Sequence, residues 1–160
     1  MLKPRDLNLR QYFFPMQNVA ANPEFDSDKE HGSQFGLETD LSIHFDDEHA
    51  RYRFTLLLTM RSDDECDGCD NDPYTYEIAA VGIFDYYPSD GQRHSEDEIT
   101  TIERDVTMMG CTVLLGAVRE RFVEMTSRGP WGPCYLDTFN AMDFLSTQKP
   151  KASLPKQSTG

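Results

Sequence analysis

Four segments of the chain alternate apolar and polar residues, which predicts β-strands. They are residues 9–16, 37–45, 51–60 and 74–84. In the third segment every second residue from Tyr52 to Met60 is apolar. Successive side chains of a strand point to opposite faces, so these segments predict a sheet with one buried face. Pro15 lacks a backbone donor, and we expect the first strand to lie at an edge or to contain a bulge.

The same alternation predicts how the strands are joined and which residues share a face. The second and third strands are connected by "HFDDEHARY", which is short enough for an antiparallel hairpin. The residues expected to share a face are Tyr12, Phe14 and Met16 in the first strand, and Leu41, Ile43 and Phe45 in the second.

The second half of the chain has helical patterning. Ser95 and the three acids after it suit a helix N-terminus, through side-chain capping and the helix dipole. One face of a helix is formed by the apolar residues Leu114, Val118, Phe122 and Met125. We expect Gly129, at the C′ position, and Pro130 to end this helix.

Strands followed by helices predict an α+β fold with the helices packed on one face of an antiparallel sheet. A last short helix is expected at residues 140–145. Residues 1–147 are expected to form a single domain. Residues 148–160 are rich in Pro, Lys and Ser, contain no acid, and are expected to form a disordered basic tail.

The charge balance narrows the classes of function. The 160 residues include 15 basic and 28 acidic ones, a net charge of −13 at pH 7. Nucleic-acid binding needs a basic face, so we expect none. No apolar run approaches the roughly 20 residues of a membrane span, and the N-terminus lacks a signal-peptide pattern. Four cysteines in a chain of this size predict no disulfide framework, so we expect a cytoplasmic protein without membrane insertion.

The most suggestive chemical motif is Cys66-x-x-Cys69, within the acidic stretch "SDDECDGCDNDPY". A structural zinc site usually needs four nitrogen or sulfur ligands, and no second pair follows at finger spacing. The surrounding carboxylates disfavour a reactive thiolate. We interpret the stretch as a long acidic hairpin loop with two incidental cysteines. Metal binding or redox chemistry at Cys66 and Cys69 is the less favoured alternative.

No catalytic pattern is found in the sequence. The four histidines are scattered, and there is no P-loop, nucleotide-binding glycine pattern or HExxH. We therefore expect no enzymatic activity, no catalytic residue and no cofactor.

Aromatic residues are more numerous than such a fold requires. They either complete a core and a subunit interface, or line an exposed groove for apolar ligands or peptides. The residues concerned are Tyr12, Phe13, Phe14, Phe84, Tyr86, Tyr87, Trp131, Tyr135, Phe139 and Phe144.

Three segments resemble, in order, the protein-export chaperone family SecB. They are "YEIAAVGIF" at 76–84, "AVRERFVEMTSRGPWGP" at 117–133 and "LDTFNAMDF" at 136–144. The features that match the family pattern are Gly82-Ile83-Phe84, Val118-Arg119-Glu120, Ser127-Arg128-Gly129, Trp131 with Pro133, and Asn140.

The resemblance implies a four-stranded antiparallel sheet with two main helices on one face, assembled as a dimer of dimers. We therefore expect self-association as a homodimer or homotetramer. It also implies ATP-independent holding of unfolded or precursor polypeptides in an exposed apolar groove, with hand-over to the SecA translocase. By matching position, the client-binding residues are expected to be Leu41, Ile43, Phe45 and Trp131, and the SecA contact Glu77.

The sequence also departs from the family. Pro15 and Val19-Ala20 stand where the family has acids for motor binding, the tail is basic, and the loop of Cys66 and Cys69 is longer than usual. These departures count against coupling to SecA. The alternative is a SecB-like dedicated chaperone or adaptor for one partner, for example of toxin–antitoxin type.

Overall fold

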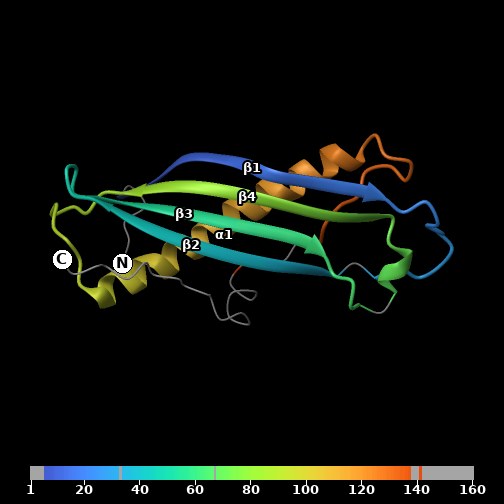
Figure 1. Cartoon of the computed structure of the whole chain (residues 1–160), viewed down its shortest axis with the longest axis horizontal. Helices are drawn as coiled ribbons and strands as arrows, with labels where there is room; N and C mark the ends of the chain where they lie inside the picture. Colours follow the sequence, from blue (N-terminus) through green and yellow to red (C-terminus); the bar gives the residue numbers. More distant parts are fainter. Residues whose placement is uncertain (1–5, 33, 67, 138–140, 142–160) are drawn as a thin grey trace.

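In the computed structural model, which describes residues 6–32, 34–66, 68–137 and 141, a four-stranded antiparallel sheet is covered on one face by a long helix (Figure 1). The strand order is β1-β4-β3-β2, so β1 and β2 are the edges. This confirms the predicted α+β class. The elements are β1 (Leu7–Ala21), β2 (Phe35–Asp46), β3 (Arg51–Ser62), the 3-10 turn η2 (Cys69–Asn71), β4 (Tyr74–Tyr86) and α1 (Glu96–Thr126).

Strand β1 is an edge strand with two shifts in its register against β4. One shift falls between Leu9 and Gln11 and the other between Phe13 and Met16. The second shift spans Pro15, which has no N–H to offer to the ladder. Both forms of the prediction for Pro15, an edge and a bulge, are therefore confirmed.

The bulge changes which residues of β1 face the helix. An extra residue in one strand reverses the alternation of side chains beyond it. Tyr12 pairs with Gly82, whereas Met16 pairs with Ala79, and these two β4 residues lie on opposite faces. The prediction that Met16 shares a face with Tyr12 is wrong, because a strict period of two does not continue through the bulge.

The predicted hairpin between β2 and β3 is confirmed. The two strands pair without a register shift as far as Asp46 and Arg51. In the turn, the Asp46 carboxylate accepts the backbone N–H groups of Glu48 and His49 at 3.1 and 3.3 Å, and Ala50 has a φ of 48°. The Asp46 side chain thus satisfies turn donors that the ladder leaves free.

The hydrophobic core lies between α1 and the facing side of β3 and β4. Its largest fully buried side chains are Phe54, Phe84, Phe122, Leu56, Leu58, Met60, Ile78 and Leu114. Two glycines let the helix come close to the sheet. A Cβ on Gly110 of the helix would lie 2.5 Å from Leu56 of β3, and one on Gly82 of β4 would lie 3.3 Å from Leu114 of the helix. The helix and sheet are therefore in direct contact at their centres.

Helix α1 unites the two helical patterns of the sequence in a single helix of 31 residues. Its N-terminus has a capping box, as Ser95 and the first-turn acids predict. The Ser95 hydroxyl accepts the Glu98 N–H at 3.4 Å, and the Glu98 carboxylate accepts the Ser95 N–H at 2.8 Å. No helix in the described part of the chain combines the length and apolarity needed to cross a membrane.

The helix predicted at residues 140–145 lies outside the described residues except for Ala141, so the fold described here has α1 as its one long helix. Within the predicted apolar stripe of α1, Leu114, Val118 and Phe122 are buried, whereas Met125 is only half-buried. Thr126 is fully buried instead. Its polar side chain can be buried because its hydroxyl donates to the carbonyl of Phe122 at 2.9 Å.

The end of α1 differs from the prediction in its cause. The helix ends at Thr126, with Ser127 as its C-cap in right-handed conformation. Gly129 lies beyond the C′ position, and its φ is not positive. A Cβ on Gly129 would collide with the hydroxyl and ring of Tyr74. The glycine is therefore required by close packing against β4, and not by a left-handed cap.

Candidate functional site

The segment that follows α1 presents Trp131 at the surface. The indole N–H of Trp131 donates to the carbonyl of Asn22 at 2.8 Å, and the ring packs edge-on against Phe25 at 5.3 Å. The residue is still 41% exposed, and the nearby Tyr135 is 72% exposed. An indole with its polar group satisfied and its ring half-open is suited to apolar contact with another molecule.

The buried phenol of Tyr74 fixes this segment to the start of β4. Its hydroxyl donates to the carbonyl of Gly132 at 2.9 Å and accepts the backbone N–H of Trp131 at 3.2 Å. A few residues further on, the N–H of Cys134 donates to the Thr126 hydroxyl at 2.9 Å. Trp131 is therefore held in place by polar contacts to two elements of the fold.

Two asparagines clamp the loop at residues 22–32, which carries Phe25, to the loop at 63–73. The Asn22 side chain donates to the Asp72 carbonyl at 3.0 Å. The Asn71 side chain donates to the Asp26 carbonyl at 2.8 Å and accepts the Asp26 N–H at 2.9 Å. Sequence reasoning missed this arrangement, because these residues lie about 45 to 50 positions apart. We name the two loops and their asparagines the two-loop clamp.

The other predicted client-binding residues lie elsewhere. Leu41 is 7% exposed and belongs to the core, and Ile43 and Phe45 are half-buried against it. Phe45 packs on Tyr52 at 4.6 Å, at the start of β3, whereas Trp131 contacts the loop that follows β1. These positions are at opposite ends of the sheet and near opposite edges. One chain therefore does not bring Trp131 together with the three β2 residues.

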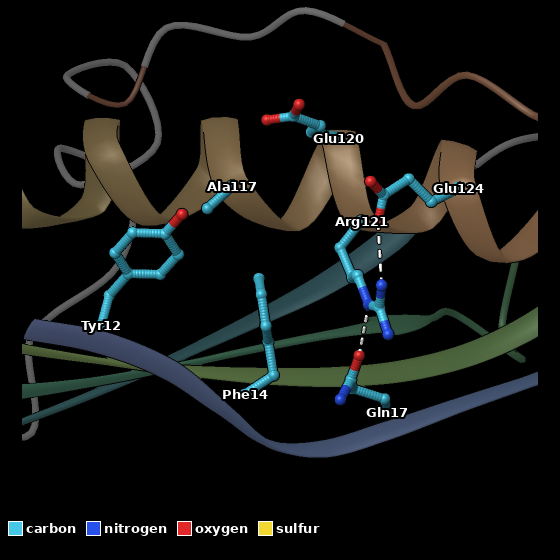
Figure 2. Close-up of a pocket in the computed structure, with 7 residues that line it drawn as sticks. All are labelled: Tyr12, Phe14, Gln17, Ala117, Glu120, Arg121 and Glu124. Atoms are coloured by element: carbon cyan, nitrogen blue, oxygen red, sulfur yellow. Dashed lines mark hydrogen bonds and ion pairs between the residues drawn. The ribbon is translucent and has the colours of Figure 1, made fainter.

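A cleft between β1 and α1 was not predicted from the sequence. Figure 2 shows Tyr12 and Phe14 pointing from β1 toward the helix, and Arg121 reaching back from α1. The Arg121 guanidinium donates to the Gln17 side chain at 2.5 Å and to the Glu124 carboxylate at 2.8 Å. The open volume is about 300 Å³. Its lining residues are Tyr12, Phe14, Gln17, Ala117, Glu120, Arg121 and Glu124.

Part of the aromatic and aliphatic surplus remains in solvent on β1 and α1. On β1 and on the outer side of α1, the exposed large apolar residues are Leu9, Tyr12, Phe13, Met109 and Val113. Large apolar side chains that remain in solvent are available for contact with another molecule. The sequence placed Tyr12 and Phe14 on one face, but it gave no sign of Arg121 opposite them, because Arg121 and its partner Gln17 lie 104 positions apart.

Glu77, the predicted SecA contact, lies on the sheet face opposite α1. It is half-buried and pairs with Asn18 of β1 and Arg61 of β3. Arg61 forms an ion pair with Glu38 of β2 at 2.8 Å. Glu77 is thus part of a mixed-charge strip near one end of the open face.

The acidic loop between β3 and β4 pairs its cysteines. Cys66 and Cys69 are joined as a disulfide, with their Cα atoms 5.5 Å apart, within the ordinary range. The sequence reasoning did not predict this pairing, which accompanies a turn in which the Cys69 N–H donates to the Cys66 carbonyl at 3.4 Å. Among the described residues, no group of three or more His, Cys, Asp and Glu side chains is placed to hold a metal ion.

The other cysteines sit where burial suppresses ionisation. Burial raises the pKa of the Cys111 thiol to about 11. Burial, followed by the charges of Asp72 and Asp137, also raises the pKa of Cys134. Both thiols are therefore protonated near neutral pH and are weak nucleophiles. Asp72 itself has a raised pKa because of burial, and its Oδ1 atom is buried without a hydrogen-bond partner.

The fold is that of a SecB-like chaperone. The structure aligns with the SecB-like chaperone Rv1957 of Mycobacterium tuberculosis, solved in complex with a ChAD peptide from the Rv1956 HigA1 antitoxin. The match has a TM-score of 0.55 and 18% sequence identity, and it covers 84% of this chain and 91% of that one. A protein of unknown function from Streptococcus agalactiae aligns with a TM-score of 0.47 and 16% identity, over 82% of this chain and 97% of that one. No protein-family model and no curated protein matches the chain.

Proposed function

We propose that this protein is an ATP-independent chaperone that holds an extended segment of a dedicated partner polypeptide. The observation that carries the proposal is the SecB-like fold together with the half-exposed Trp131 on an acidic body. The similar chaperone of Mycobacterium tuberculosis binds a peptide from an antitoxin, and this supports a specific partner over a general pool of clients. The chemistry required is binding and release, with no catalytic residue and no cofactor.

The proposed client surface centres on Trp131 and Tyr135, with Phe25 beside them. An apolar client side chain would displace water from these rings, while sequence-independent contacts to the client main chain would allow varied segments to bind. Ile43 and Phe45 are a second candidate contact at the other edge. Leu41 is already buried in the core of its own chain, so we assign it a supporting position beneath that contact.

General precursor holding with transfer to SecA is the second candidate function. It is favoured by Glu77, which lies on the open face of the sheet in the strand where the family resemblance implies acids for motor binding. It is disfavoured by Pro15 and Val19-Ala20, which leave the neighbouring part of β1 without acids. In either case we propose a cytoplasmic homodimer or homotetramer, since exposed apolar residues on β1 and α1 would be covered by a second subunit.

The test is binding of a permanently unfolded model protein, reduced and carboxymethylated α-lactalbumin, in the absence of nucleotide. We expect Trp131→Ala to weaken binding by about tenfold, which is ~1.4 kcal/mol for one aromatic contact. Tyr87→Ala is the matched control, because Tyr87 is also aromatic and 40% exposed but directly follows the C-terminal end of β4, whereas Trp131 lies near its start. The absence of binding by the wild-type chain to this protein and to a panel of antitoxin-derived peptides would refute chaperone function.

A separate measurement distinguishes the two candidates. A dedicated chaperone binds one peptide far more tightly than the unfolded model protein and does not bind SecA. A general export chaperone binds SecA, and Glu77→Ala weakens that interaction while leaving client binding unchanged.

A further inference from the structure

Cys66 and Cys69 touch the far end of the loop at residues 22–32. The carbonyl oxygen of Gly32 lies 3.2 Å from the sulfur of Cys69 and 3.8 Å from that of Cys66. The N–H of Gly32 donates to the carbonyl of Gly68 at 3.4 Å. The cysteine turn is therefore part of the two-loop clamp and directly contacts its other loop.

The same turn sets the position of the asparagine that organises the clamp. Cys69 is the first residue of η2 and Asn71 is the last. The Asn71 side chain holds the backbone of Asp26 in both directions, at 2.8 and 2.9 Å. Phe25 immediately precedes Asp26 in the chain, and its ring packs against Trp131. A continuous set of contacts thus leads from the cysteines to the half-exposed indole.

We propose that Cys66 and Cys69 form a reversible oxidation site whose state sets how the loop at residues 22–32 packs against Trp131. The co-reactant is a low-molecular-weight disulfide. Its S–S bond is broken and reduced to two thiols, while the two cysteine thiols lose two electrons and two protons and form one S–S bond. The protons are taken up by the departing thiolates, and reduction runs the same exchange in reverse.

The short span of the Cys66–Cys69 bridge favours a regulatory role over a stabilising one. A disulfide stabilises mainly by constraining the unfolded chain, and it does so least when it spans few residues. The Cys66–Cys69 bridge has a sequence separation of only three. Both cysteines are half-buried in a surface loop, so a small reagent can reach them. In a reducing compartment such bonds are typically transient or redox-sensing.

The two redox states differ in the positions of the sulfur atoms beside Gly32 and in whether these atoms carry a proton. In the oxidised state the sulfurs are held at about 2.05 Å from each other and carry no proton. In the reduced state they separate and rotate independently, and each gains an S–H group. The turn that fixes Asn71 then loses its covalent constraint. We expect the loop at residues 22–32 to relax and Trp131 to lose part of its contact with Phe25.

Trp131 provides the readout, since it is the single tryptophan of the chain. The full chain is equilibrated with mixtures of reduced and oxidised dithiothreitol, a neutral couple that the acidic surface does not repel. Mass spectrometry follows the loss of two hydrogens from the peptide that contains Cys66 and Cys69. We expect one two-electron transition, and indole emission that moves to longer wavelength on reduction along the same curve.

Two variants identify the residues that cause the change in indole emission. Cys66→Ser with Cys69→Ser is expected to show the long-wavelength emission at every ratio. It retains Cys111 and Cys134, so a signal from either of these would persist. Asn71→Ala is expected to keep the oxidation transition and lose most of the emission change. Emission that is unchanged or moves to shorter wavelength on reduction, or cysteines that stay reduced at every ratio, would overturn the proposal.

The consequence for client binding rests on the proposed function, but the fluorescence test does not. If the oxidised and reduced forms differ in emission and neither binds an unfolded polypeptide, the oxidation site stands and the chaperone proposal fails. If both forms bind clients and their emission is identical, the chaperone proposal stands and the switch fails.

Discussion

The hydroxyl of Tyr74 lies 2.9 Å from the carbonyl oxygen of Gly132, across 58 positions of sequence. The hydroxyl of Tyr74 also accepts the N–H of Trp131 at 3.2 Å. One buried phenol therefore positions the segment on which the proposed client contact depends. Nothing in the local sequence around Trp131 indicates this support.

We expect Tyr74→Phe to destabilise the fold by about 1–2 kcal/mol, since it leaves a partly buried N–H and a carbonyl without their partner. Urea unfolding monitored by circular dichroism measures the change. Tyr135→Phe is the control, because Tyr135 is largely exposed, and a shift below about 0.5 kcal/mol is expected there. Equal effects at the two positions would contradict a supporting role for Tyr74.

The two glycines in the middle of α1 should respond to alanine in opposite directions. A Cβ on Gly110 meets Leu56 and Phe84, whereas a Cβ on Gly116 meets nothing within 4 Å. We expect Gly116→Ala to stabilise the protein by roughly 0.5–1 kcal/mol through helix propensity. Gly110→Ala gains the same propensity but should be destabilising by about 1–3 kcal/mol because of overpacking. Thermal unfolding of the two variants side by side provides the measurement.

Cys111 should make the fold sensitive to alkali. Its pKa is raised by burial from an ordinary value near 9 to about 11. The folded state keeps the thiol proton longer than the unfolded state, so stability is complete below pH 9 and falls as the pH rises to about 11. The loss attributable to this group should approach ~2 kcal/mol.

Cys111→Ala isolates this contribution from other alkaline titrations. The difference in unfolding free energy between wild type and variant should change between pH 8 and pH 10.5, in favour of the variant at the higher pH. A difference that stays constant across this range would show that Cys111 ionises equally in both states.

An ion pair on the open face of the sheet depends on the first shift of β1. Asp85 is 2% exposed, and its carboxylate lies 2.8 Å from Arg10 and 3.5 Å from Arg53. Because Arg10 is half-exposed, we expect a coupling energy with Asp85 of only about 1 kcal/mol in a double-mutant cycle of Arg10→Ala and Asp85→Ala. Asp85→Ala alone should cost more than Arg10→Ala, since it leaves two guanidinium groups without their shared partner.

The features of the fold that depend on local sequence patterns were predicted correctly from the sequence. All four strands, the β2–β3 hairpin, the edge position of Pro15 and the Ser95 helix start are confirmed. The face of Met16 was wrong, because one extra residue in a bulge reverses a period of two. The cause of the helix end was also wrong, since the role of Gly129 depends on Tyr74, which is distant in sequence.

The candidate site was only partly predictable. Trp131 was identified from its place after the helix, and it is half-exposed. The two-loop clamp beneath it depends on Asn22 and Asn71, whose side chains bind backbone groups rather than a recognisable partner residue. Such contacts have no periodic signature. The pairing of Cys66 with Cys69 likewise depends on the shape of a turn that composition does not report.

The close approach of α1 to the sheet at Gly110 and Gly82 limits which parts of the molecule can adjust to the clients proposed above. Side chains interlocked at the midpoint prevent the helix from sliding or rolling across the strands. Any adjustment must then come from the segment beyond Thr126 and from the loops that contact it, which are held by hydrogen bonds and not by interlocked side chains. The core of α1 and the sheet is thus rigid, and the segment after Thr126 with its neighbouring loops is the adjustable part of the molecule.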